Sequence, residues 1–308
     1  MPETRDSVCC IGGMTLDRVL RLQQPAVRGT SNPVSGRLRR GGVARNVAEN
    51  LARLSVSCSL VSIVGNDDAG RILLNETAAL GVDTGLVQKS LGKATGSCTR
   101  AIEPDGELFI SFADMEICDA MDRSFIQNCW LQISNAGIVF ADTNLSAGSL
   151  SYLITGCRED DVRLVIGAVS TTKARRLPLN LNGVDILVCN RAEARAMLGD
   201  DIARDLEGMS KAICQRGATS AVVTAGSDGI CFASDGQCLT LPAASIRPVD
   251  VSGAGDALIA GILFGRLKQY DFVTSLRIGQ KAAAMTLVCE EPNSPELSAE
   301  SVTEGLQP

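Results

Sequence analysis

Short runs of consecutive apolar residues alternate along the chain with longer stretches in which apolar residues recur every three or four positions. Helical spacing is clearest at Val43, Val47, Leu51 and Leu54. Short, mostly apolar runs are typical of strands buried on both faces, and they lie at 8–11, 60–64, 138–141, 164–166, 186–189 and 221–224. Strands that alternate with helices usually form parallel sheets. The pattern therefore predicts an α/β, doubly wound fold with a mostly parallel central sheet.

Two segments depart from this pattern. Residues from about 18 to 40 alternate loosely and contain two prolines, which suits exposed strands better than a core helix. Within about 94–116, two alternating runs flank Pro104-Asp105-Gly106, and Asp-Gly at a short connection is a hairpin signal. Together the two segments predict a small separate β-sheet that projects from one domain spanning residues 1–308.

Composition narrows the class of protein. With 308 residues, 45% hydrophobic and 21% charged, the chain is able to bury a large core. The net charge is −6, so there is no basic surface of the kind that binds nucleic acid. Polar or charged residues interrupt the long apolar stretches, and residues 1–7 are polar, unlike a signal peptide. We expect a soluble, cytoplasmic protein that binds neither nucleic acid nor membrane.

The reactive side chains limit the chemistry further. Twelve cysteines occur at irregular spacing without a C-x-x-C pair, which is typical of reduced thiols in a core. Histidine is absent, which excludes Ser-His-Asp and Cys-His catalysis and imidazole-zinc sites. Because there are only two tyrosines, carboxylates are the leading candidates for acid–base work.

The most informative stretch is Val249-Asp250-Val251-Ser252-Gly253-Ala254-Gly255-Asp256, which precedes an apolar run. Two glycines one residue apart predict a tight turn that opens a helix, whose free N–H groups and dipole favour an anion such as phosphate. A carboxylate beside an anion site is unfavourable unless it takes part in chemistry, such as removing a proton from an attacking hydroxyl. Asp256 is therefore a candidate base; the alternative is that it only stabilises the helix start.

Other candidate residues follow strands or precede helices. Asp17 comes shortly after the first strand, which is an α/β ligand position or a plain turn. Gly41-Gly42 precede the helix that carries Asn46, which indicates a close backbone approach. Asn190 and Glu193 start another helix, where a glutamate is ordinary. Thr224 to Gly229 joins two strands either as an open phosphate-binding loop or as a simple hairpin.

The order of these elements resembles the ribokinase-like (PfkB) carbohydrate kinases. In that family the aspartate of the G-A-G-D motif is the catalytic base, and the preceding amides form the anion hole, here Gly253, Ala254 and Gly255. Ser252 stands where the family more often has threonine. The family's sugar-binding Asp, Gly-Gly and Asn correspond to Asp17, Gly41, Gly42 and Asn46. Its projecting sheet is a lid over the sugar and can pair subunits, so a homodimer through this sheet is implied.

The resemblance also implies a nucleotide site for ATP. The N-x-x-E element corresponds to Asn190 and Glu193, which in the family hold the water shell of the nucleotide Mg²⁺. The T-x-G-x-x-G element corresponds to Thr224, Gly226 and Gly229, and Ser252 before the glycine turn is a further candidate for binding the nucleotide. Asp250 is a candidate ligand for a monovalent cation such as K⁺.

A narrower resemblance to pseudouridine kinases lies in four segments: Gly41 to Asn46, Ile110 to Met115, Phe140 to Asn144 and Asn293 to Ser298. It implies 5′-phosphorylation of the C-nucleoside pseudouridine, adds Asp114 and Asn144 to the substrate site, and implies a functional partner, pseudouridine-5′-phosphate glycosidase. Such kinases tend to read D-P-V-S where this chain has Gly167-Ala168-Val169-Ser170. A carboxylate near the phosphate and metal region is therefore missing, which leaves the efficiency and metal dependence open.

Three alternatives remain. The chain could be another sugar or nucleoside kinase of the same fold, such as a ribokinase or an adenosine kinase. It could also be a non-catalytic ligand-binding regulator, although a pure binder has no use for a base at Asp256. A Rossmann dehydrogenase is disfavoured because no G-x-G-x-x-G follows the first strand.

Overall fold

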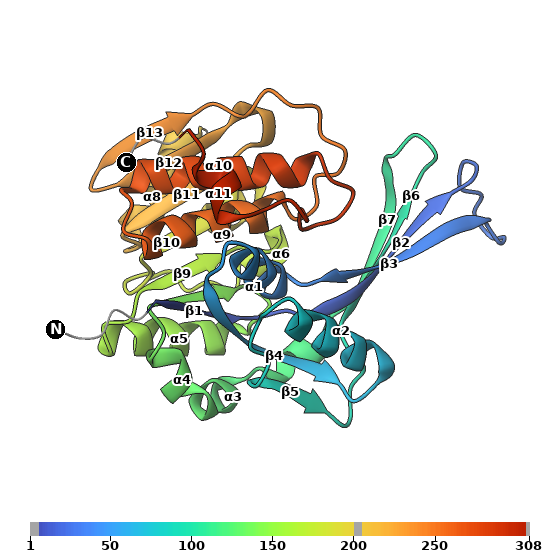
Figure 1. Cartoon of the computed structure of the whole chain (residues 1–308), viewed down its shortest axis with the longest axis horizontal. Helices are drawn as coiled ribbons and strands as arrows, with labels where there is room; N and C mark the ends of the chain where they lie inside the picture. The colour runs from blue at the N-terminus through green and yellow to red at the C-terminus, as the bar shows by residue number, and fades with distance from the viewer. Residues whose placement is uncertain (1–5, 200–204, 306–308) are drawn as a thin grey trace.

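The structure is a computed structural model that describes residues 6–199 and 205–305. Within these ranges the strands form two sheets, a nine-stranded one in the body of the molecule and a four-stranded one that projects from it (Figure 1). The α/β class and the separate small sheet that the sequence predicts are both confirmed. No helix in the described ranges has the length and apolar character needed to span a bilayer.

The large sheet is parallel except at one end. Its strand order is β13-β12-β11-β10-β9-β8-β1-β4-β5, and only the β11–β12 and β12–β13 pairs are antiparallel. The strands are β1 (Ser7–Ile11), β4 (Ser57–Gly65), β5 (Val87–Ser90), β8 (Ile138–Asp142), β9 (Leu164–Gly167), β10 (Ile186–Asn190), β11 (Ser220–Thr224), β12 (Ile230–Ser234) and β13 (Gln237–Leu241). Each apolar run of the sequence became one of these strands, because both faces of the sheet are covered.

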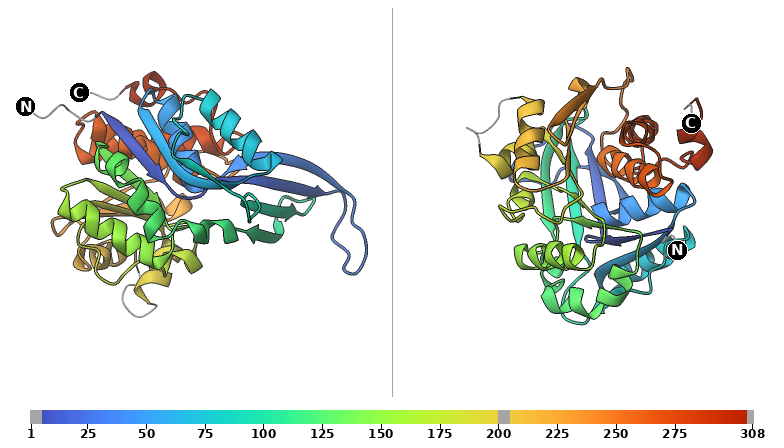
Figure 2. Two further views of the ribbon diagram at one scale, coloured as in Figure 1. Left: turned by 90° about the horizontal axis from the view of Figure 1, so that it is seen from below. Right: turned by 90° about the vertical axis from the view of Figure 1, so that its left-hand side faces the viewer.

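Helices cover the two faces of the large sheet and create two cores (Figure 2). Alternate residues of β1 serve opposite faces: Val8 and Cys10 join one core, Cys9 and Ile11 the other. The first core involves α1 (Val43–Arg53), α2 (Asp68–Ala79), α9 (Ala254–Leu267), α10 (Phe272–Leu287) and α11 (Ala299–Thr303). The second involves α3 (Arg123–Asn128), α4 (Trp130–Ser134), α5 (Ala147–Glu159), α7 (Arg191–Leu198) and α8 (Leu206–Gln215). A short helix, α6 (Thr171–Ala174), follows β9.

The projecting sheet contains β2 (Thr15–Leu22), β3 (Val34–Gly41), β6 (Ser97–Ile102) and β7 (Leu108–Asp114) in the order β3-β2-β6-β7. It extends away from the body in Figure 1 and in the left view of Figure 2. The hairpin predicted around Pro104-Asp105-Gly106 is the antiparallel β6–β7 pair.

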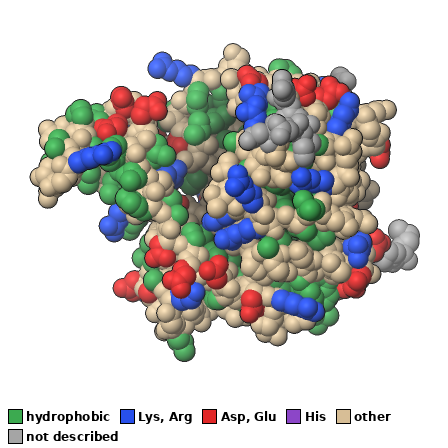
Figure 3. Space-filling model, turned by 180° about the vertical axis from the view of Figure 1, so that it is seen from behind, with side chains coloured by type: hydrophobic (Ala, Val, Ile, Leu, Met, Phe, Trp, Pro, Cys, Tyr) green, Lys and Arg blue, Asp and Glu red, His purple; other side chains and the backbone are tan. Residues whose placement is uncertain are grey.

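The two faces of the projecting sheet differ in chemistry. Successive residues of a strand point to opposite faces, and the strand register places Arg37, Val19, Arg100 and Ser111 in one row. The next row on that face contains Arg39 and Asp17. The opposite face carries a row of Leu38, Arg18, Thr99 and Phe112. Leu38 is 58% exposed and Phe112 62% exposed, and hydrophobic side chains are visible on the projecting sheet in Figure 3.

Candidate active site

The glycine turn before α9 has the conformation that the sequence predicts. Gly253 has φ +79°, a left-handed conformation, and a Cβ there would lie 1.9 Å from the Pro292 carbonyl oxygen. A Cβ at Gly255 would meet nothing within 4 Å. Gly253 is thus required by the backbone, whereas Gly255 keeps the space in front of the helix open. The N–H groups of Ala254 and Gly255 begin a fourteen-residue helix, so this turn is suited to an anion.

Asp256 lies in the first turn of α9, directly after the glycine turn. Its Oδ2 accepts a hydrogen bond of 2.7 Å from the Asn46 side-chain amide on α1. Burial raises the pKa of Asp256 to about 7; the Asn46 bond opposes the rise, while repulsion from Asp142 adds to it. A carboxylate that titrates near neutral pH is suited to general-base work. The hydrogen bond to the Asp256 carboxylate comes from Asn46 on α1 and not from the backbone of α9. This favours a role for Asp256 beyond stabilising the start of its own helix.

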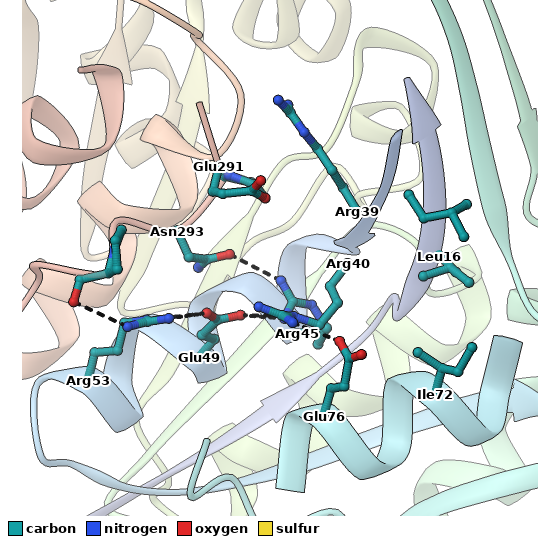
Figure 4. Close-up of a pocket in the computed structure, with 13 residues that line it drawn as sticks. Leu16, Arg39, Arg40, Arg45, Glu49, Arg53, Ile72, Glu76, Glu291 and Asn293 are labelled. Carbon is teal, nitrogen blue, oxygen red and sulfur yellow. Dashed lines mark hydrogen bonds and ion pairs between the residues drawn. The ribbon is translucent and has the colours of Figure 1, made fainter. Parts of the chain in front are cut away.

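A buried polar network fixes the orientation of Asn46. The Arg45 guanidinium is fully buried, pairs with Glu49 at 2.5 Å, and donates both to Asn46 Oδ1 and to Asn293 Oδ1. The Asn293 amide in turn donates to the Asn46 carbonyl at 2.9 Å. Figure 4 shows Arg45 between Glu49 and Asn293. With its amide oxygen bound by Arg45, Asn46 presents its NH₂ group to Asp256. Arg45 and Asn293 were not singled out for this role from the sequence; the only signal was the four-residue spacing of Arg45 and Glu49.

The glycine pair before α1 lets three segments meet at the predicted sugar site. A Cβ at Gly41 would lie 2.3 Å from Asp17 Oδ2, and one at Gly42 would lie 2.2 Å from the Gly13 carbonyl oxygen. Asp17 is on β2, and its Oδ1 accepts a bond from the Cys98 backbone N–H at 3.1 Å. Burial raises the pKa of Asp17 from its ordinary value. The predicted residues Asp17, Gly41 and Gly42 are therefore brought together.

Asp142 organises the floor of this site. It is fully buried, and its Oδ2 accepts the backbone N–H groups of Gly13 (2.9 Å) and Ala44 (3.0 Å). Its Oδ1 accepts the N–H of Asn144 at 2.8 Å. The side chain of Asn144 is also buried, and its oxygen accepts from Lys173 on α6. Asp142 thus joins the ends of β1 and β8 to the start of α1 and positions Asn144.

Asp114 does not lie with these residues. Its register partner is Ser97, so by strand alternation it shares the face of Phe112, opposite the face of Asp17. It is exposed at the end of β7. We therefore leave Asp114 out of the substrate site proposed below.

A pocket of about 360 Å³ adjoins the glycine turn. Three residues predicted to bind nucleotide line it, namely Thr224, Gly226 and Gly229, together with Ala254 and Gly255. Its other lining residues are mostly apolar: Ser227, Ile230, Ala243, Ala244, Ile246, Pro248, Val251, Leu258, Gln280, Ala283, Ala284 and Leu287. A mostly apolar pocket that ends at free helix N–H groups fits a nucleotide base and its phosphates. The segment 243–248 was missed from the sequence because it has no periodic pattern.

Asn190 and Glu193 form a reciprocal cap at the start of α7. Asn190 Oδ1 accepts from the Glu193 N–H and Glu193 Oε2 from the Asn190 N–H, both at 2.9 Å. Burial raises the pKa of Glu193. Glu193 also lies close enough to Asp256 to raise the pKa of that carboxyl, so the two acids face the same region. In the described ranges no three metal-ligating acids, cysteines or histidines cluster.

Comparison with known proteins agrees with this geometry. Residues 5–299 match the family described as pfkB family carbohydrate kinase. The chain belongs to this family. The kinase is 29% identical to the "Pseudouridine kinase" of Escherichia coli K12 over 97% of this chain and 96% of that protein. Its structure is similar to a carbohydrate kinase from Agrobacterium tumefaciens, with a TM-score of 0.84 and 29% identity over 96% of this chain and 95% of that one.

More distant relatives show the fold of this kinase. The ribokinase of Arabidopsis thaliana, solved with ribose and ATP, superposes with a TM-score of 0.83 at 19% identity, covering 96% of this chain and 97% of that one. Kinases of the pfkB family use ATP as the phosphate donor.

Two residues that the sequence singled out, Gly167 and Asp250, have close contacts in the structure. A Cβ at Gly167 would lie 3.0 Å from both Ile259 Cδ1 on α9 and Phe140 Cζ on β8, so an aspartate there would require these two side chains to shift. Asp250, the candidate ligand for K⁺, pairs instead with Arg39 at 2.8 Å and accepts the Ser252 N–H at 2.8 Å. A cation at Asp250 would therefore compete with a guanidinium.

Proposed function

We propose that this kinase transfers the γ-phosphate of ATP to the 5′-hydroxyl of a nucleoside, with pseudouridine as the substrate and pseudouridine 5′-phosphate as the product. The observation that carries the reaction type is the position of Asp256. Its carboxylate has a pKa of about 7 and lies one residue after the glycine turn that adjoins the nucleotide pocket. The choice of pseudouridine is supported by the E. coli kinase to which the chain is similar along nearly its whole length.

Asp256 removes the proton from the attacking hydroxyl in this mechanism. The 5′-oxygen forms a bond to the γ-phosphorus, the bond from that phosphorus to the bridging oxygen of ADP breaks, and ADP leaves with its electron pair. The amides that begin α9 receive the negative charge of the phosphoryl group during transfer. Asn46 holds the carboxylate of Asp256 in place through its 2.7 Å bond.

The substrate hydroxyls bind at the junction of Asp17, Gly42 and Asn46, while the projecting sheet selects the base. A buried carboxylate that accepts hydroxyl donors discriminates strongly, because a missing hydroxyl leaves it unpaired at a cost of about 1–3 kcal/mol. Pseudouridine should therefore be phosphorylated about ten times or more faster than its 2′-deoxy analogue at low substrate concentration. Equal kcat/KM for the two would contradict this assignment.

Magnesium would arrive with ATP in this proposal, and Asn190 and Glu193 would hold it through its waters. Mg²⁺ commonly keeps several waters and binds through one or two carboxylates plus phosphates, and Glu193 is a buried carboxylate at the start of α7 that suits this role. When bound, the ion neutralises phosphate charge. Glu193→Gln should raise the Mg²⁺ concentration needed for half-maximal rate more than it changes the KM for nucleoside. Activation by K⁺ at Asp250 remains a prediction.

Two partners complete the proposal. Pseudouridine 5′-phosphate would be consumed by a glycosidase that splits its C-glycosidic bond.

A second copy of the chain would cover the exposed face of the projecting sheet that carries Leu38 and Phe112, which are 58% and 62% exposed. Phe112→Ser should then shift the molecular mass in light scattering from dimer to monomer, and an unchanged mass would contradict the pairing.

The test of the function is a panel of acceptors with Mg-ATP, monitored by ADP release and by ³¹P NMR of the product. The panel contains pseudouridine, uridine, adenosine, guanosine, inosine and ribose. We expect the highest kcat/KM with pseudouridine and a 5′-monoester product. Preference for ribose or a purine nucleoside would reassign the substrate within the family, and ATP binding without transfer to any acceptor would indicate a ligand-binding regulator.

A further inference from the structure

Arg100 reaches from the projecting sheet to the glycine turn. It lies on β6, and its Nη1 donates to the Ser252 hydroxyl at 2.8 Å. Ser252 directly precedes Gly253, so this guanidinium is next to the amides that begin α9. On its other side it is close enough to Asp17 to oppose the rise in the pKa of that carboxyl. Arg100 therefore lies between the sugar end and the phosphate end of the site.

Arg100 differs from Arg37 and Arg39, on the same face, in having no carboxylate within ion-pair distance. Arg39 pairs with Asp250, and Arg37 pairs with Glu290. Arg100 makes no ion pair within residues 6–199 and 205–305. Its Nε is buried without a hydrogen-bond partner, as are those of Arg39 and Arg40, but the guanidinium groups of Arg39 and Arg40 are each paired with a carboxylate. A buried guanidinium nitrogen without a partner is unfavourable in a folded protein unless water, an ion or a ligand completes its bonding. The charge of Arg100 is thus available to an anion.

Several carboxyl groups lie around Asp256. Asp142 and Glu193 are close enough to add to the rise in its pKa, and Asp17 lies at the predicted sugar end of the site, against Gly41. Phosphoryl transfer adds charge on the oxygens of the moving group, and protein cations commonly stabilise that charge. Arg45 is committed to Glu49, so it does not supply this cation.

We propose that Arg100 binds the phosphoryl group of ATP as it transfers, with the projecting sheet delivering this cation to the glycine turn. The inference rests on the proposed kinase reaction and adds a catalytic residue that the sequence motifs do not contain. The planar guanidinium donates from Nη and Nε to two phosphate oxygens, which suits a tetrahedral group becoming planar. Ser252 holds the guanidinium at the turn before the phosphate arrives.

The test compares Arg100→Met and Arg100→Lys with wild-type enzyme. Removal of one donor from a preorganised anion site lowers kcat about 10²–10³-fold, and we expect this loss in Arg100→Met with the KM for nucleoside within a few-fold. ADP affinity in calorimetry should stay within about twofold, while ATP affinity falls. Added guanidinium should restore part of the turnover of Arg100→Met, a response that loss of a purely structural residue would not give.

Arg21→Met is the matched control. Arg21 lies on β2, on the face of the projecting sheet that also carries Arg100. It pairs with Ile102, one row beyond the row of Arg100 on that face, and its side chain is exposed. The variant removes the same charge without touching the turn, so its turnover should be unchanged. Turnover of Arg100→Met within threefold of wild type overturns the proposal. A raised KM for nucleoside at unchanged kcat also overturns it, because Arg100 would then act with Asp17 in binding the nucleoside. A parallel loss of ADP binding and folding overturns it as well, because Arg100 would then be a structural residue. If the wild-type enzyme transfers phosphate to no acceptor, the proposed function is contradicted and not the role of Arg100. In that case the comparison of ATP and ADP affinities between Arg100→Met and wild type still tests whether Arg100 binds the γ-phosphate.

Discussion

The side-chain amide of Asn46 donates to the carboxylate of Asp256 at 2.7 Å, which joins the starts of helices α1 and α9 across 210 positions of the chain. This bond favours the charged form of Asp256, and burial favours the neutral form. Burial has the larger effect, because the pKa of Asp256 rises to about 7. The carboxylate is thus held in one place and still able to gain and lose a proton near neutral pH.

Activity should follow the protonation of Asp256. A base works only when deprotonated, so log kcat/KM should rise with a slope near one as pH increases and level off above about pH 7. The measurement is kcat/KM for pseudouridine at saturating Mg-ATP between pH 5.5 and 9. A profile that is already flat at pH 6 would show that Asp256 is not the titrating base.

The free energy of unfolding should decrease over the pH range in which activity increases. The pKa of Asp256 is raised on folding, so its contribution to stability is present below its unfolded pKa of about 3.8 and is lost as pH rises through about 7. Asparagine does not ionise, so the Asp256→Asn variant does not lose this stability as pH rises. In urea unfolding, the free energy of the variant relative to wild type should therefore increase between pH 5 and pH 8. A difference that does not change with pH would contradict the burial of a charged Asp256.

Two arginines that share Glu49 should differ in their effect on stability. Arg45 is 0% exposed and Arg53 is 20% exposed, and both pair with Glu49. Arg45→Met removes the buried donor shared by Glu49, Asn46 and Asn293, and breaking a buried pair costs about 3–5 kcal/mol. Arg53 is partly accessible to solvent, which reduces the contribution of its charge, and Glu49 keeps Arg45 when Arg53 is replaced. Arg45→Met should thus lower the free energy of unfolding several times more than Arg53→Met. Equal losses in chemical denaturation would show that Arg45 is not the centre of the network.

The two glycines of the turn should separate folding from catalysis. A Cβ at Gly253 would lie 1.9 Å from the Pro292 oxygen in a left-handed backbone, so Gly253→Ala should lose both stability and turnover. A Cβ at Gly255 would meet no atom within 4 Å. Gly255→Ala should keep the melting temperature and lose ATP affinity and turnover, because the methyl group enters the space for phosphate. Normal ATP binding by Gly255→Ala would place the phosphates elsewhere.

The fold was predictable because its signals are local. A strand covered on both faces needs an apolar run, as in 138–141, and a left-handed turn needs a glycine, as at Gly253. The order of these elements along the chain was enough to indicate the architecture. The same local logic found the glycine turn, Asp256 and the Thr224 to Gly229 loop.

The contacts that complete the site depend on tertiary packing and left no local signal. Arg45 and Glu49 at four-residue spacing look like an ordinary surface pair on a helix, yet both are buried behind Asn46. The partners of Arg39 and Arg100 lie 211 and 152 positions away, at Asp250 and Ser252. Asp114 illustrates the converse: its motif suggested a substrate contact, but the register of β7 turns it to the face opposite Asp17.

The most direct test of the account is the turnover of Asp256→Asn. Asparagine keeps the shape of the side chain but not its basicity, and general-base catalysis contributes roughly 10²–10⁴-fold. We predict that kcat for nucleoside phosphorylation falls by about two orders of magnitude or more, while the affinities for ATP and nucleoside stay within a few-fold and the protein remains folded. Near-normal turnover, or loss of ATP binding and folding together, would show that Asp256 only stabilises the start of α9 and would contradict the mechanism.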